Sequence, residues 1–355
     1  MKKKILALLM AVTTMAAMVT GCGNGNGNDS AADTSADGKT YKVAIVQYVD
    51  DASLNQIVSA VQAQLDAKGA ELGVTFDYAD YTYNGQADAT TMNQIATDLI
   101  ASEVDIIVPV ATPVAMVMQN ATAESPREDG SLIPIVFSAV SDPIGAGLVA
   151  DLNAPGSNIT GTSDALNTDA VFDLMFAADP DIGTVGLLYD KSQDSSTAAI
   201  AAAKAYCEEK GVTVVEKTGT NNGEISLAAD ALVAAGAEAV FTPTDNNVMT
   251  AELAIYEKFI DAGVPHYCGA DSFALNGAFL GYGVNYEELG TATADMVVEI
   301  LVNGADPAST PVVMMDNGIA TVNTETAEAI GLDYGMFADM CTNLVEIQTA
   351  EEFSN

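Results

Sequence analysis

The residues best suited to bind a charged small molecule follow two expected strands of the first half of the chain. Residues 106–110 form a short, β-branched run, and Thr112 and Pro113 follow it after one alanine. Thr112 suits a helix N-cap, and Pro113 suits the first helical turn. Amides at a helix N-terminus, with a hydroxyl beside them, bind a carboxylate or phosphate. Ser138, at the end of the expected strand 133–138, adds a second hydroxyl at the same sheet edge.

A carboxylate takes the corresponding place in the second half. When the halves are aligned at an offset of 133 residues, Asp245 lies over Thr112. One half then offers neutral donors and a helix dipole, and the other offers a negative charge. This asymmetry suits a zwitterion whose carboxylate contacts Thr112 and Ser138. Its ammonium would contact Asp245, helped by Asp164. Helix capping is the alternative role for Thr112, Asp245 and Asp164, and a buried structural hydroxyl is the alternative for Ser138.

The charge of the chain argues against anionic partners. Asp and Glu number 49 against 12 Lys and Arg, a formal net charge of −37, which disfavours nucleic-acid binding. The single arginine, Arg127, lies in an expected surface loop, so the strand ends lack the cation that a phosphate or dicarboxylate would require. No P-loop, Gly-x-Ser-x-Gly elbow or metal-ligand cluster occurs, so we expect binding without catalysis, cofactor or metal.

The single histidine and the three cysteines beyond the export signal are expected to be structural. His266 lies within an expected strand, and the spacing of Cys207, Cys268 and Cys341 matches no metal site. We expect buried free thiols, with a bridge between Cys268 and Cys341 as the alternative. Aromatic walls for a binding site are available from four residues near the strand ends, Tyr48, Phe137, Tyr189 and Tyr282.

Two runs of alternating strands and helices position these residues. Strands are expected at 43–49, 74–78, 106–110 and 133–138, and again at 185–189, 212–216, 239–242 and 264–268. Helices are expected at 54–72, 91–102, 114–123, 196–210, 225–235 and 249–262. Such alternation predicts an α/β fold with parallel sheets. Matches between the halves at nearly equal offsets predict two Rossmann-like lobes joined by a hinge, with segment 153–164 as a crossing point. They would share a cleft beyond the carboxyl ends of their strands.

The first residues form an export signal. Three lysines at 2–4 precede an apolar run at 5–19, which is shorter than a membrane span requires. The run ends in Val-Thr-Gly-Cys, similar to a bacterial lipobox, which would make Cys22 the lipidated mature N-terminus. An ordinary secretory signal is the alternative. Residues 23–40 are rich in Gly, Asn, Asp, Ser and Ala and predict a flexible tether.

Seven short segments, taken in order, carry a resemblance to a known family. They are VAIVQYVD (43–50), VATP (110–113), PIVFSAVSDP (134–143), GAGLV (145–149), PGSNITGTSD (155–164), TDN (244–246) and YGVNY (282–286). They resemble the solute-binding lipoproteins of ABC importers, in the branch associated with aromatic amino acids. The resemblance implies a periplasmic-binding-protein type I fold and delivery of a captured solute to a membrane permease. The chain departs from the family at Asp51-Ala52, where His-Pro is usual, and at Asp194-Ser195, where Asn-Ser is common.

We therefore expect the extracytoplasmic, lipid-anchored solute-binding component of an ABC importer, which captures a small, aromatic amino acid between its lobes. The alternatives are a binding protein for another small solute, such as a branched-chain amino acid or nucleoside, and an extracytoplasmic sensor domain. The expected partners are the ligand, an ABC permease and ATPase, and the membrane through the anchor; the chain is expected to be a monomer.

The expected boundaries and binding residues complete these predictions. The signal peptide covers 1–21 and the tether 22–40. The first lobe covers 41–162 plus about 285–310, and the second covers 163–284 plus about 311–355. The expected ligand-binding residues are Gln47, Tyr48, Ala111, Thr112, Pro113, Phe137, Ser138, Asp164, Tyr189, Ser195, Thr244, Asp245, Asn246 and Asp271.

Overall fold

The structure is a computed structural model that describes residues 38–350. The predicted export signal, Cys22 and most of the predicted tether lie outside the described residues. Within 38–350, no helix combines the length and apolar character needed to cross a membrane.

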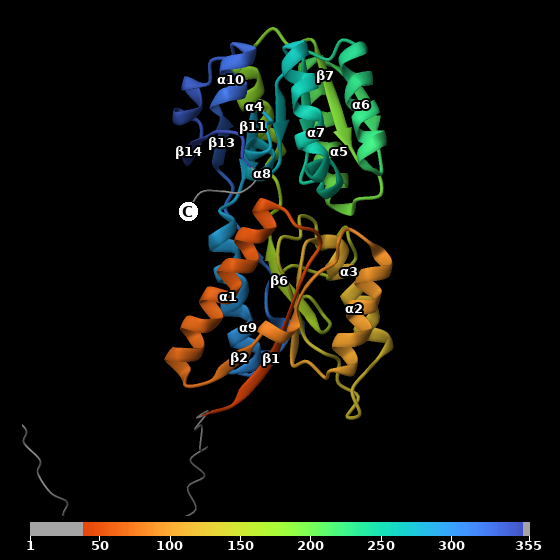
Figure 1. The fold of residues 1–355 in the computed structure, drawn as a ribbon, viewed down its shortest axis with the longest axis vertical. Helices are drawn as coiled ribbons and strands as arrows, with labels where there is room; N and C mark the ends of the chain where they lie inside the picture. The colour runs from red at the N-terminus through yellow and green to blue at the C-terminus, as the bar shows by residue number, and fades with distance from the viewer. Residues whose placement is uncertain (1–37, 351–355) are drawn as a thin grey trace, which may run out of the picture. The chain divides into compact units, whose positions relative to one another are not determined.

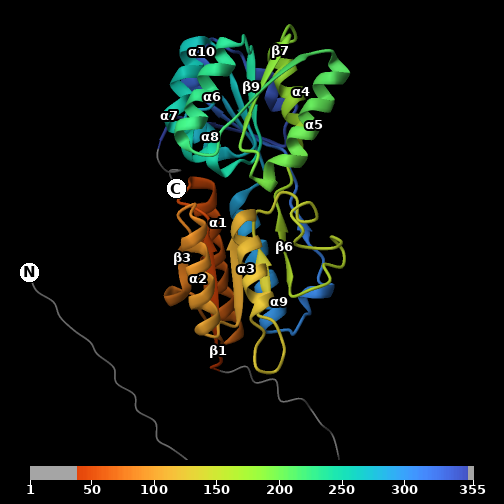
Figure 2. The ribbon, with the colours of Figure 1, turned by 90° about the vertical axis from the view of Figure 1, so that its right-hand side faces the viewer.

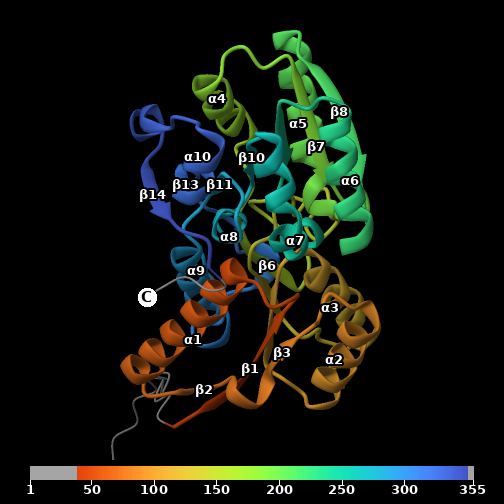
Figure 3. The same cartoon turned by 45° about the horizontal axis from the view of Figure 1, so that its top comes forward.

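The first lobe is built on a seven-stranded parallel sheet in the order β12-β6-β5-β4-β1-β2, with β3 also paired to β1. Its strands are β1 (Thr40–Gln47), β2 (Thr75–Asp77), β3 (Thr82–Asn84), β4 (Ile106–Val110), β5 (Ile135–Phe137), β6 (Ile159–Ser163) and β12 (Val313–Met314). Its helices are α1 (Ala52–Leu72), α2 (Ala89–Ala101), α3 (Thr112–Glu124) and α9 (Tyr286–Leu301). Helix α1 packs beside α9, and α2 packs beside α3 (Figures 1 and 3). Strand β4 is fully buried, as in sheets covered on both faces.

The second lobe contains another seven-stranded sheet, in the order β14-β13-β11-β10-β9-β7-β8. Two of its strands, β7 and β9, are labelled in Figure 2. Its strands are β7 (Thr184–Tyr189), β8 (Thr213–Thr218), β9 (Ala239–Thr242), β10 (His266–Cys268), β11 (Leu280–Gly283), β13 (Ile319–Asn323) and β14 (Asn343–Ile347). Only the β11–β13 pair among them is antiparallel. Its helices are α4 (Thr168–Ala178), α5 (Asp194–Lys210), α6 (Asn222–Ala234), α7 (Asn246–Ala262), α8 (Asp271–Leu275) and α10 (Thr324–Ile330). Three short 3-10 helices are η1 (Ala79–Tyr81), η2 (Pro307–Ser309) and η3 (Gly335–Asp339).

The described chain passes between the sheets three times, from β6 to α4, from β11 to α9 and from β12 to β13. The predicted α/β fold of two lobes with mostly parallel sheets is therefore confirmed. We expected the chain to pass into the second lobe at about residue 311. It passes later, because β12 pairs with β6 and keeps Val313 and Met314 in the first sheet.

Six strands were not predicted, namely β3, β6, β11, β12, β13 and β14. Strand β6 lies inside the segment 153–164 that we expected to be only a crossing, and it contains mainly Thr, Ser and Gly. Its hydroxyls are nevertheless satisfied inside the fold: Thr162 Oγ1 lies 2.8 Å from Thr293 Oγ1, and Thr160 donates to the carbonyl of Thr310 at 2.8 Å. Hydrogen bonding thus replaces the apolar pattern that normally marks a buried strand.

The expected structural roles of the histidine and cysteines agree with their surroundings. His266 is buried, with Nδ1 3.0 Å from Glu252 Oε1 and Nε2 2.8 Å from Thr242 Oγ1. Cys207 and Cys268 are buried free thiols, and Cys341 is a half-buried free thiol, so the alternative Cys268–Cys341 bridge does not form.

Candidate functional site

A narrow pocket lies between the lobes, at the carboxyl ends of strands from both sheets. The first lobe contributes the starts of α1 and α3 and the loop after β5, and the second contributes the starts of α5 and α7. The lining residues are Ser53, Leu54, Ala111, Thr112, Ala139, Ser141, Asp164, Ser195, Thr244, Asn246, Met249, Ala270 and Tyr286. The pocket encloses about 20 Å³, which is roughly the space for one water molecule.

Asp164 is the charged group of this pocket. Its side chain is 6% exposed, and its Oδ1 accepts a hydrogen bond from Ser141 Oγ at 2.9 Å. None of the described residues that line the pocket is Lys, Arg or His. Burial raises the pKa of Asp164 to about 6, partly offset by the Ser141 hydrogen bond. A buried carboxylate without a cation is costly, so this position favours a positively charged group of a ligand.

A hydroxyl pair links Asp164 to the second lobe. Ser141 Oγ lies 2.8 Å from Thr244 Oγ1, across the lobe boundary. A serine hydroxyl has one proton, and Ser141 donates it to Asp164. Thr244 is therefore the donor to Ser141, and Asp164 is oriented by a chain of two hydrogen bonds that includes both lobes.

Two further hydroxyls in the pocket are buried without a hydrogen-bond partner among the described residues. They are Thr112 Oγ1 and Ser195 Oγ, on side chains that are 2% and 5% exposed. Buried polar groups are normally paired, so these two are available to a ligand.

Thr112 is the first residue of α3, and Pro113 lies in the first turn as predicted. The prediction that Thr112 is the N-cap is wrong, because Ala111 occupies that position and no side-chain hydrogen bond caps the helix. The preceding Ala111 has φ 83°, a conformation that costs energy for a non-glycine residue and that is concentrated at functional sites.

Asp245 does not line the pocket. It caps α7, with Oδ1 accepting from the amides of Asn247 (3.1 Å) and Val248 (3.0 Å). Its Oδ2 accepts from the amide of Asp190 (2.8 Å) and from Ser196 Oγ (2.7 Å). These four donors occupy the acceptor sites of the carboxylate. Asp245 thus has the surroundings of a helix cap, which was the alternative role expected for it. Burial raises the pKa of Asp245 to about 6.

The structure brings together six of the predicted binding residues in the pocket, namely Ala111, Thr112, Asp164, Ser195, Thr244 and Asn246. It places eight outside the pocket lining, namely Gln47, Tyr48, Pro113, Phe137, Ser138, Tyr189, Asp245 and Asp271.

The eight residues outside the lining have other surroundings. Ser138 Oγ lies 2.9 Å from Thr293 Oγ1 inside the first lobe, and Gln47 donates to Asn55 Oδ1 at 2.7 Å. Phe137 and Tyr189 are core residues of the first and second lobes.

Asp271 connects the two lobes beside the pocket. Its Oδ1 accepts from Ser53 Oγ at 2.5 Å, and its Oδ2 accepts from Gln56 Nε2 at 3.0 Å; both donors belong to α1. Tyr48, on the first lobe, makes a longer contact of 3.4 Å with Asn247 Oδ1 on the second.

Seven lining residues were not predicted, namely Ser53, Leu54, Ala139, Ser141, Met249, Ala270 and Tyr286. Ser53 and Leu54 had a usable signal, because Asp51 is a helix N-cap residue two residues after an expected strand. Ser141 lies three residues past Ser138 in the same loop. The others are apolar or aromatic residues whose orientation depends on how the lobes meet.

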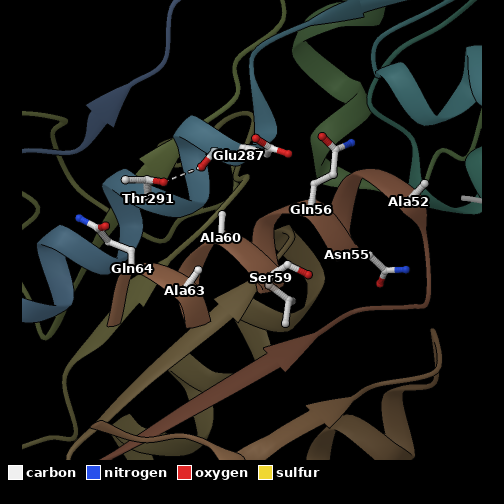
Figure 4. A pocket seen from close by; sticks show the side chains of 10 residues that line it. Ala52, Asn55, Gln56, Ser59, Ala60, Ala63, Gln64, Glu287 and Thr291 are labelled. Atoms are coloured by element: carbon white, nitrogen blue, oxygen red, sulfur yellow. Dashed lines mark hydrogen bonds between the residues drawn. The ribbon is translucent and has the colours of Figure 1, made fainter. Parts of the chain in front are cut away.

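A larger and more open hollow lies along α1 and α9 in the first lobe (Figure 4). Ala60 and Ala63 of α1 and Glu287 and Thr291 of α9 line it, and the Thr291 hydroxyl already donates to the carbonyl of Glu287 at 2.9 Å. It contains no strand end and none of the buried hydroxyls without a partner. The inter-lobe pocket is therefore the candidate site.

Comparisons with known proteins agree with this architecture. The family model described as ABC transporter substrate binding protein matches residues 42–335. A tyrosine-binding protein of Clostridioides difficile (strain R20291) is 29% identical over 334 residues, which is 93% of this chain and 93% of that protein.

Two solved structures are similar over most of the chain. The ABC domain in complex with L-Trp from Streptococcus pneumonia is 28% identical, with a TM-score of 0.77, and the match covers 86% of this chain and 100% of that one. The ligand-free, open structure of a substrate binding protein with adhesive properties from Clostridium difficile is 29% identical, with a TM-score of 0.65, covering 87% and 100%. The predicted resemblance is confirmed: the chain belongs to the ABC transporter substrate-binding protein family and has the periplasmic-binding-protein type I fold.

Proposed function

We propose that this protein captures an aromatic L-amino acid between its lobes and delivers it to an ABC importer, without chemical change to the ligand. The observation that carries the proposal is the buried Asp164 carboxylate, which lies in a pocket lined by no cationic residue among those described. The similarity to a tyrosine-binding protein and to an L-Trp complex supports the choice of ligand.

The two charges of the ligand are assigned to the two ends of the pocket. Asp164 takes the ammonium group, the role that we predicted mainly for Asp245. The N-terminus of α3 and Thr112 Oγ1 take the carboxylate, because this hydroxyl is buried and has no partner among the described residues. Leu54, Met249 and Tyr286 supply apolar contacts nearby.

The family and the N-terminal sequence support a proposal for the cellular arrangement. We place the protein on the extracytoplasmic face of the membrane, anchored by a lipid on Cys22 and acting as a monomer with an ABC permease and ATPase. Mass spectrometry of the mature protein tests the anchor: a diacylated Cys22 N-terminus supports it, and an unmodified secreted protein contradicts it.

Calorimetric titration with Trp, Tyr and Phe tests the proposed ligand, with Leu and adenosine as the competing solute classes. We expect binding of at least one aromatic amino acid. Asp164→Asn should weaken that binding by about 30-fold or more, because truncating one partner of a buried charge pair costs about 2–5 kcal/mol. Asp181→Asn, at an exposed acid outside the pocket, is the matched control. Heat with Leu or adenosine, but with none of the aromatic amino acids, would contradict the proposal.

A further inference from the structure

A second hollow, of about 300 Å³, adjoins the inter-lobe pocket. Its walls come from the loop at Ser141 and Asp142, from the crossing segment after Asp164, and from one side of α5. Ser141 and Ser195 line both the hollow and the pocket. The two spaces are therefore neighbours that share two lining residues, and Asp164 of the pocket directly precedes Ala165 of the hollow.

The inter-lobe pocket is too small to take an aromatic ring. At about 20 Å³ it offers little room beside its one charged lining residue, Asp164. The neighbouring hollow has the missing volume. Its wall on α5 is formed by Ala198, Ala199 and Ala202, with Leu166 opposite in the crossing segment. Small apolar side chains on a rigid helix leave a surface against which a flat ring buries its faces.

Besides Ser195 Oγ, a second hydroxyl that lines the hollow has no hydrogen-bond partner among the described residues. Thr168 Oγ1, at the start of α4, is buried, with the side chain 3% exposed, and has no hydrogen-bond partner among the described residues. Asp142 and Asp169 also line the hollow, and none of the described lining residues is a cation. These surroundings favour a side chain that ends in a hydrogen-bond donor and disfavour one that ends in a carboxylate.

We propose that this hollow receives the side chain of the bound amino acid, and that the Thr168 hydroxyl pairs with a polar donor on its ring, such as a phenol or an indole N–H. The inference rests on the proposed function and extends it from the charged groups of the ligand to its side chain. It makes α5 and the start of α4 the elements that determine specificity.

Filling the hollow tests the placement of the ring. Ala202→Phe puts a ring into the hollow from α5, and Ala201→Phe makes the same change at an exposed neighbour that does not line it. We expect Ala202→Phe to weaken binding of the best aromatic ligand at least tenfold, and Ala201→Phe to leave it unchanged, with both variants retaining the wild-type melting temperature within a few degrees. Equal affinity in the two variants would overturn the proposal.

A second variant tests the polar contact independently. Thr168→Val removes the hydroxyl and keeps the shape of the side chain. We expect it to reduce the preference for Tyr over Phe by about fivefold or more, since only Tyr carries a donor at the ring tip. An unchanged Tyr-to-Phe ratio would remove Thr168 from the proposal. If the wild-type protein binds no aromatic amino acid at all, the proposed function itself fails, which calorimetry on the unmodified protein shows before either variant is made.

Discussion

The hydroxyl of Ser53, in the first turn of α1, donates to Asp271 Oδ1 of the second lobe at 2.5 Å. The same hydroxyl accepts from the amide of Ser272 at 3.2 Å, and Gln56 Nε2 donates to the other carboxylate oxygen at 3.0 Å. Helix α1 and the start of α8 are thus joined by three hydrogen bonds beside the candidate site. These bonds exist only while the lobes lie together, so they stabilise the arrangement that encloses a ligand.

Removing a donor from this contact should therefore accelerate ligand release. Gln56→Ala deletes one hydrogen bond to the half-buried Asp271 carboxylate, and Gln56 does not line the inter-lobe pocket. We expect affinity to fall by about 5- to 30-fold, the effect of losing roughly 1–2 kcal/mol, with most of the change in the dissociation rate. Stopped-flow measurement of dissociation checks this. Ser59→Ala, at an exposed position on α1, is the control, and equal dissociation rates in the two variants would contradict the role of the contact.

The carboxylate of Asp51 should make the protein more stable in mild acid than at alkaline pH. Burial and the nearby charge of Asp271 raise the pKa of Asp51 to about 7. A raised pKa means that the folded state binds a proton more tightly than the unfolded state. Its contribution to stability is therefore full at low pH and is lost as the pH rises through about 7.

Asp51→Asn isolates this contribution, because asparagine still caps the helix and carries no charge. We expect the variant to melt about 2–4 °C above the wild type at pH 8, the shift that about 1 kcal/mol gives in a domain of this size. At pH 3, below the ordinary aspartate pKa of 3.8, the carboxyl is protonated in the folded and unfolded states and the two should melt together. Thermal unfolding at the two pH values measures the difference, and a variant that is less stable than the wild type at pH 8 would contradict the argument.

The arrangement of the two lobes was predictable because strands such as β4 and β9 are short apolar runs between amphipathic helices. Strand β6 was not predictable by the same pattern, since Thr160 and Thr162 are polar and are buried through hydrogen bonds to residues far along the chain. The spacing of apolar residues in the sequence indicates which side chains pack against other apolar groups. It does not indicate which hydroxyls find hydrogen-bond partners far along the chain.

Only part of the candidate site was predictable, because the direction of a side chain, like the burial of β6, depends on contacts with distant parts of the chain. The alignment of the halves placed Thr112 and Asp245 at equivalent strand ends, and both do begin helices or cap them. The direction of each side chain depends on its neighbours: Ser196 and the amide of Asp190 satisfy Asp245 inside its own lobe. Asp164 lines the pocket because the crossing segment passes between the lobes there, which is a property of the tertiary structure.

Asp245 should consequently matter more for stability than for ligand choice. Asp245→Asn replaces a carboxylate oxygen by an amide that faces two donors, the Asp190 amide and the Ser196 hydroxyl. We expect a loss of about 1–3 kcal/mol in the free energy of unfolding, the usual cost of unsatisfied buried groups. The relative affinities for Trp, Tyr and Phe should stay as in the wild type. Chemical denaturation and calorimetry measure the two effects, and a changed ligand preference with unaltered stability would return Asp245 to the binding site.

The pH dependence of binding should follow the ionisation of Asp164. Burial raises the pKa of this carboxyl to about 6 in the ligand-free protein, and the ammonium group of an amino acid requires its ionised form. Affinity should therefore be constant above about pH 7 and fall as the pH drops below about 6, approaching tenfold per pH unit when a single proton must be released. Calorimetric titrations between pH 5 and pH 8 measure this slope. Asp164→Asn has no proton to lose, so its weaker binding should be independent of pH over the same range; a variant that keeps the wild-type slope would assign the titration, and the ammonium contact, to another carboxylate.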